Sequence, residues 1–136
     1  MEPTTLLPAI ALFSLVTVEY GGWALLGMIT RTPGYPELDE FREQFFRAGH
    51  AHAGTLLVMA LAYFALLPRA GFSETVQWAA GGGLMTGILV LSGGFFLHLA
   101  KGRPGEPSVG TRVTRIGAMT LGIPLLVLAV GLVRAG

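Results

Sequence analysis

The chain has 136 residues, of which 52% are hydrophobic and only 12% are charged, about half the charged fraction usual in a soluble domain. Its net charge of +1, with basic residues spread along the chain, leaves no basic stripe for nucleic acid. The absence of cysteine excludes disulfides, thiolate metal sites, cysteine nucleophiles and iron–sulfur clusters, so histidine, carboxylate and methionine are the candidate ligands.

Four apolar segments are long enough to cross a membrane, which takes about 20 residues of α-helix. In chain order they are residues 6–29, 45–67, 76–100 and 113–133. Stretches rich in proline, glycine and charge separate them, and such stretches end helices. The first segment has no basic residue before it, unlike a secretory signal, so we expect it to be retained as an anchor. The sequence therefore predicts one four-span transmembrane domain over residues 1–136.

The two halves of the chain resemble each other. GGWALLGMITRTPG in the first half is similar to GGFFLHLAKGRPG in the second, and FRAGHAHAG aligns with TRIGAMTLG. Because each half holds two apolar segments, this similarity predicts parallel repeats of one helical hairpin. The expected fold is all-α, an integral membrane four-helix bundle built from two similar hairpins.

Basic residues are unevenly distributed between the two sides of this bundle. Only two lie on the side of the termini, Arg69 and Arg134. Seven lie in or beside the longer loops, residues 30–44 and 101–112: Arg31, Arg42, Arg47, Lys101, Arg103, Arg112 and Arg115. Since cytoplasmic loops of membrane proteins are enriched in arginine and lysine, we expect both termini outside and both longer loops in the cytoplasm.

Glu19 is an ionisable residue near the middle of the first apolar segment. A charged carboxylate at the bilayer centre costs about 2.5–3.5 kcal/mol on insertion scales, so residues of this kind are rare and often functional. Two interpretations stay open. Glu19 is either a metal ligand or proton acceptor, or a neutral acid hydrogen-bonded to a neighbouring helix through Tyr63, Thr86 or Thr120.

The three histidines, His50, His52 and His98, all fall in the half of the membrane next to the longer loops, at a depth that side chains from Glu19 could bridge. Residues two apart on an α-helix point about 200° away from each other, so only one of His50 and His52 is expected to face the bundle. Histidine is the commonest metal ligand and titrates near neutrality. The alternative is a set of interfacial histidines bonded to backbone, water or lipid phosphate.

The first longer loop predicts a surface helix over residues 37–47 that leads into the second span, with an ion pair between Glu43 and Arg47. Its aromatic residues are expected to face the membrane: Phe41, Phe45 and Phe46. Glycines flank His50 and recur in the third span, and they predict close helix packing: Gly49, Gly54, Gly81, Gly82, Gly83, Gly87, Gly93 and Gly94.

Three partial resemblances bear on function. HAHAG resembles the His-x-His segment of subunits related to the catalytic subunit of haem-copper oxidases, over residues 46–61 only, without that family's further ligand histidines. FREQFFRAGHAHAG is similar in layout to the second-helix entry of the glutathione-linked MAPEG enzymes, but lacks their Asn and Glu. Four spans with a carboxylate in the first resemble small multidrug-resistance transporters, without other matching residues. The sequence thus identifies no family.

The leading hypothesis is a polar site in the cytoplasmic half of the bundle that binds a transition metal or a b-type haem. Its candidate metal ligands are Glu19, His50, His52 and His98, and the three histidines are the candidate haem ligands. The alternatives are a proton-coupled transporter or channel using Glu19, and a noncatalytic accessory subunit of a membrane complex. No nucleophile constellation assigns catalytic residues. The expected partners are the lipid bilayer and either a second copy of the chain or another membrane subunit.

Overall fold

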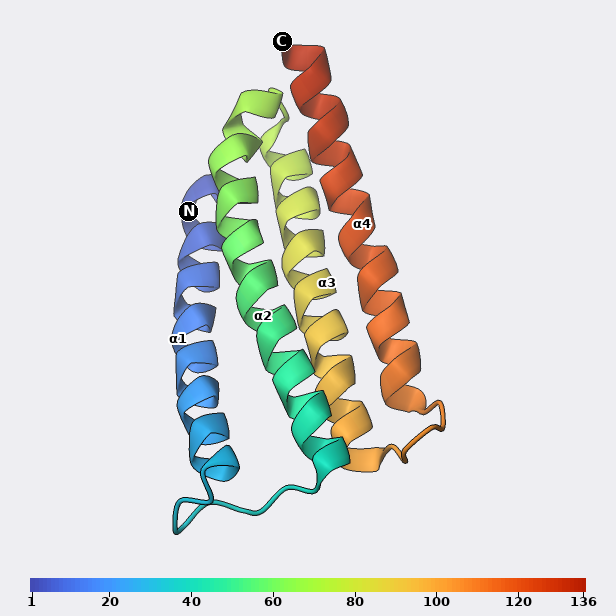
Figure 1. Ribbon diagram of the computed structural model, residues 1–136. Helices are drawn as coiled ribbons and strands as arrows, with labels where there is room; N and C mark the ends of the chain where they lie inside the picture. The colour runs from blue at the N-terminus through green and yellow to red at the C-terminus, as the bar shows by residue number, and fades with distance from the viewer.

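The computed structural model describes all 136 residues and contains four long helices (Figure 1): α1 (Pro3–Ile29), α2 (Glu40–Leu66), α3 (Glu74–Lys101) and α4 (Val109–Ala135). A short 3-10 helix, η1 (Leu67–Ala70), directly follows α2. All four long helices are long and apolar enough to cross a membrane, and there are no strands. The expected all-α membrane bundle is therefore confirmed.

The helices extend beyond the predicted spans because polar residues form their first turns. α2 begins with Asp39 as its N-cap, whose side chain accepts a hydrogen bond from the backbone N–H of Arg42 at 2.8 Å. α4 begins after a capping box in which Ser108 and Thr111 bond each other's backbone N–H groups. Apolar composition identifies the part of a helix that crosses lipid, whereas the caps determine where the helix starts.

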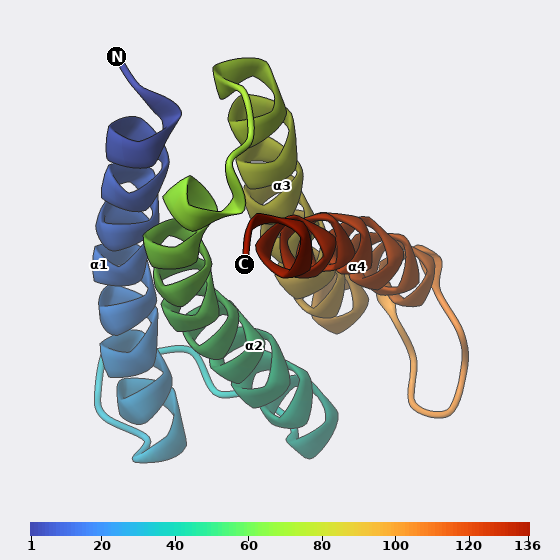
Figure 2. The ribbon, with the colours of Figure 1, turned by 90° about the horizontal axis from the view of Figure 1, so that it is seen from above.

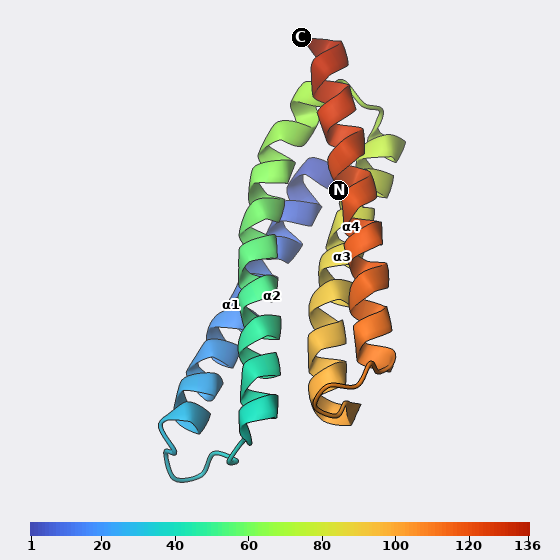
Figure 3. The same ribbon diagram turned by 45° about the vertical axis from the view of Figure 1, so that its right-hand side comes forward.

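The chain forms two antiparallel hairpins, α1–α2 and α3–α4, as expected from the repeat. Both termini lie at one end of the bundle, and the connections over residues 30–39 and 102–108 lie at the other, which we call the long-loop end (Figure 1). Figure 2 shows that α2 and α3 are central, that α1 packs outside α2, and that α4 packs on α3. α1 and α3 diverge toward the long-loop end (Figure 3).

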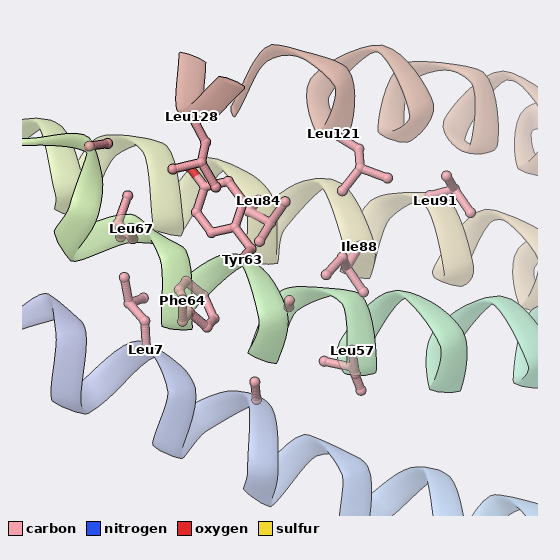
Figure 4. Packing of buried hydrophobic residues seen from close by; sticks show 13 residues of the cluster. Leu7, Leu57, Tyr63, Phe64, Leu67, Leu84, Ile88, Leu91, Leu121 and Leu128 are labelled. Atoms are coloured by element: carbon pink, nitrogen blue, oxygen red, sulfur yellow. The ribbon is translucent and has the colours of Figure 1, made fainter. Parts of the chain in front are cut away.

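The hydrophobic core joins all four helices in layers, with α2 and α3 in the middle (Figure 4). Leu67 and Leu84 are fully buried in it. Tyr63 of α2 donates a hydrogen bond to the carbonyl oxygen of Pro124 in α4 at 3.3 Å, which links the two hairpins. α1 contributes only Leu7 and Ala11 to this cluster. The first helix is thus held to the core chiefly near its N-terminal end.

Glycines bring the backbones of α3 and α4 into direct contact. Gly87 and Gly94 of α3 are seven residues apart, as are Gly110 and Gly117 of α4, so each pair lies on one face of its helix. A Cβ atom at Gly87 would lie 2.8 Å from the backbone of Leu121, and one at Gly117 would overlap the backbone of Leu91. Side chains at these four positions would push the two helices apart.

The glycines predicted to allow close packing divide into two groups. Those in contact with another helix are Gly49, Gly54, Gly81, Gly87 and Gly94. The remaining three have open space where a Cβ atom would stand: Gly82, Gly83 and Gly93. Packing is therefore confirmed for the first group and wrong for the second.

Replacing Gly117 by leucine should separate α3 from α4, because the new side chain would meet backbone rather than a flexible side chain. We expect a loss of about 3 kcal/mol or more in the free energy of unfolding. Gly122→Leu is the matched control, since a Cβ atom there meets nothing within 4 Å. Thermal unfolding of both variants in the same detergent measures the difference, and equal stability would contradict backbone contact at Gly117.

Candidate functional site

Glu19 lies on the outer face of α1, exposed, and makes no hydrogen bond or ion pair within the chain. The expected bond to Tyr63, Thr86 or Thr120 does not form. Large apolar residues share this exposed face: Leu12, Val16 and Trp23. A proton pathway through Glu19 would therefore run along the outside of the bundle. The homo-oligomer stays a prediction.

His50 and His52 point to opposite sides of α2, as the helix geometry requires. The His50 ring packs against α1, where a Cβ atom at Gly22 would lie only 3.1 Å from its Nε2. Neither ring nitrogen of His50 has a hydrogen-bond partner in the chain. His52 instead stacks on Phe95 of α3, with ring centres 4.7 Å apart, and its Nδ1 lies 2.8 Å from the carbonyl oxygen of Ala48. His50 is thus the one histidine whose two ring nitrogens are both unpaired.

His98 is buried at the long-loop end, where it connects α3 to the start of α4. Its Nδ1 is hydrogen-bonded to the hydroxyl of Ser108 at 2.6 Å. The same hydroxyl oxygen accepts the backbone N–H of Gly110 at 3.0 Å. The rings of Phe41 and Phe45 pack against the imidazole, with centres 5.4 and 4.3 Å away. These contacts give His98 a structural role at the joint between two helices.

The lead-in to the second span packs on the end of α3. The ion pair between Glu43 and Arg47 is confirmed, with an N–O distance of 2.7 Å. The prediction that Phe41, Phe45 and Phe46 face the membrane is not confirmed, because the three residues are half-buried and each ring packs against an aromatic side chain of α3. α2 begins at Glu40, so its first two turns already lie alongside the end of α3.

The four predicted ligands have no common centre. Glu19 is outside the bundle, His50 faces α1, His52 faces α3, and His98 is bonded to the α4 cap. Nowhere does the structure bring together three histidine or carboxylate side chains that could hold a metal ion. Of the predicted set, His50 alone lines a cavity within the membrane-spanning part of the bundle.

That cavity, of about 490 Å³, lies between α1, α2 and α3, and α4 contributes nothing to it. Its lining is mostly apolar, with five polar side chains: Ser14, Thr17, His50, Thr86 and Ser92. Thr17 and Leu89 are exposed, so the cavity opens on the outer surface between the diverging α1 and α3. Its size and composition are those of a small-molecule site, since such sites span roughly 300–1,000 Å³ and are mainly apolar with a few polar groups.

Ser92 is the residue that the sequence analysis missed. It is only 6% exposed, it lines the cavity, and its hydroxyl is the one buried side-chain polar atom without a hydrogen-bond partner. Leaving a buried hydroxyl unpaired costs about 1–3 kcal/mol, so unpaired groups call for an explanation. In the sequence, Ser92 is the single serine of the apolar run GILVLSGGFF, directly before Gly93, which borders the same cavity.

Comparison with known proteins does not connect this arrangement with a family. No protein-family model matches the chain, and no curated protein or solved structure matches it significantly. The function is therefore argued from the cavity and its lining residues.

Alanine substitutions at two serine N-caps, Ser108 and Ser73, test how much the contact between His98 and the start of α4 stabilises the fold. Ser108→Ala removes the cap of α4 and the hydrogen bond to His98, and should lower the free energy of unfolding by about 1–2 kcal/mol. Ser73→Ala is the matched control, because Ser73 occupies the N-cap of α3 without a side-chain capping bond. Chemical denaturation of both variants measures the difference, and a loss as large for Ser73→Ala would refute this account.

Proposed function

We propose that this protein binds a membrane-borne small molecule in the cavity between α1, α2 and α3. The observation that carries the proposal is a largely apolar cavity of about 490 Å³ in which the imidazole of His50 has no partner, and which is bordered by Ser92, whose buried hydroxyl is also unpaired. The Ser92 hydroxyl is covered in this structure and would have to rotate to meet a ligand, and a bond to that ligand would remove the cost of burying it unpaired. The opening between α1 and α3 is consistent with entry from the hydrocarbon of the bilayer.

The charge distribution supports an orientation for this site. Seven of the nine lysine and arginine residues lie at or near the long-loop end, and two lie at the end of the termini. We therefore place the long-loop end in the cytoplasm and both termini outside, following the enrichment of basic residues in cytoplasmic loops. His50, one turn after Arg47 on α2, would then lie in the cytoplasmic half of the membrane.

A b-type haem is a second candidate for the same cavity, because neutral imidazole is a common axial ligand of haem iron and His50 has no competing partner. His52, His98 and Glu19 are not in the cavity, so the protein would supply one axial ligand. An absorption spectrum separates the two candidates. A Soret band in the purified protein that disappears in His50→Ala would favour haem, and its absence would leave the organic ligand.

The substitution Gly93→Leu should block the cavity without disturbing the fold. Gly93 lines the cavity, and a Cβ atom there meets nothing within 4 Å, so the side chain would occupy the empty space. We expect a compound to co-purify with the wild type in mild detergent and to be reduced at least tenfold in Gly93→Leu, because the ligand and the leucine compete for the same volume.

Mass spectrometry of organic extracts measures this compound per mole of protein. Gly122→Leu is the control, because it adds the same side chain to α4, which does not border the cavity. A compound retained equally by the wild type and both variants is not bound in the cavity, and the proposal would then be wrong.

A further inference from the structure

The polar groups of the cavity differ in the hydrogen-bonding capacity that remains for a ligand. The hydroxyls of Ser14 and Thr17 already donate to backbone carbonyls of α1, at 2.8 and 2.7 Å, so only their oxygen lone pairs remain. The hydroxyls of Ser92 and Thr86 donate to nothing, and the His50 imidazole, which carries at least one N–H in either protonation state, has no partner. The two groups nearest the long-loop end are therefore both free donors, and they suit a ligand head that accepts hydrogen bonds.

The cavity contains no group that would balance a charged head. None of its lining residues is Lys, Arg, Asp or Glu, and His50 is the only titratable one. A carboxylate or phosphate moved into this lining would lose its hydration without gaining a full opposite charge, which is unfavourable in an apolar surrounding. A neutral acceptor, such as a carbonyl oxygen, does not meet this obstacle.

The shape at this end of the cavity favours a flat group. Phe46 and Phe96 form an edge-to-face pair with ring centres 5.5 Å apart, one turn closer to the long-loop end than His50 on α2. Gly21 and Gly93 border the cavity from α1 and α3 without side chains, and the space at Gly93 is open, whereas the His50 ring lies 3.6 Å from where a Cβ atom of Gly21 would stand. Aromatic rings and backbone present flat surfaces on which a planar ring packs well.

The rest of the lining suits an apolar tail. Toward the end of the termini it consists mainly of aliphatic side chains: Ile10, Leu57, Met85, Ile88 and Leu89. These residues come from all three helices and continue the cavity away from Ser92 and His50, with the hydroxyl of Thr86 beside them. A molecule with a ring head and a hydrocarbon tail would match both parts.

We infer that the cavity takes a neutral planar ring carbonyl with an apolar tail, the chemical class of the quinones, and that Ser92 and His50 donate hydrogen bonds to its carbonyl oxygens. This inference rests on the proposed function and specifies the ligand of that same cavity. Binding alone is inferred, without any transfer of electrons or protons.

Three probes with the same tail and different heads test it: a decyl-substituted benzoquinone, decanol and decanoic acid. Each is titrated into the detergent-purified protein and its binding measured by equilibrium dialysis, with Gly93→Leu giving the nonspecific uptake by micelles. The quinone should bind the wild type at least tenfold more tightly than decanol or decanoic acid, because only the quinone presents two acceptors on a flat neutral ring.

Variants then test the two donors. Ser92→Ala should weaken quinone binding roughly 3- to 10-fold, the effect of one hydrogen bond, and leave decanol binding almost unchanged. His50→Gln keeps an N–H donor and should bind the quinone better than His50→Leu. Thermal unfolding checks that each variant is folded.

The outcomes separate the inference from the proposed function. If decanol or decanoic acid binds as tightly as the quinone, and Gly93→Leu still blocks binding, the ligand class is wrong and the cavity remains a binding site. If no probe binds above the Gly93→Leu level and no compound co-purifies, both are overturned. If the quinone binds but Ser92→Ala and His50→Leu have no effect, the assignment of the donors is wrong.

Discussion

The direct backbone contact between α3 and α4 determines how the other two helices can pack. Glycines at the contact points of both helices let their backbones touch, so the two helices lie unusually close together. α2 packs on one flank and adds most of the remaining core, and α1 then has only α2 and the near part of α3 to contact. The cavity exists because α1 follows α2 and not α3 toward the long-loop end.

The central position of α2 also explains why His50 and His52 have different surroundings. A helix with neighbours on two sides can place residues two positions apart against different helices, and each ring then has a different surrounding. The recess at Gly22 accepts one ring, while Phe95 stacks on the other. The doublet is therefore two independent features. Only His50, which keeps its ring nitrogens unpaired, belongs to the candidate site.

Composition and the helix-ending stretches rich in proline, glycine and charge were sufficient to predict the number of spans, the hairpins and the all-α class. Crossing a bilayer strongly constrains the length and polarity of a segment. They could not predict which way a side chain points. Glu19 was expected inside the bundle because a carboxylate in a membrane span is costly, yet it lies on the outer face. The free-energy cost of burying a carboxylate does not tell whether this chain or a partner would compensate for it. The aromatic residues at the start of α2 were assigned to lipid because the sequence does not reveal that α3 ends beside them. Ser92 was overlooked because a single hydroxyl is common in membrane helices, and its lack of a partner becomes visible only in three dimensions.

The sideways opening of the cavity changes what selectivity must depend on. A ligand that arrives from water gains free energy by leaving it, so apolar contact area supplies much of the affinity. A ligand that diffuses within the bilayer is already surrounded by hydrocarbon, and exchanging lipid tails for leucine and isoleucine side chains gains little. Discrimination among the many apolar molecules of a membrane would then depend almost entirely on the few hydrogen-bond donors of the cavity, His50 on α2 and Thr86 and Ser92 on α3.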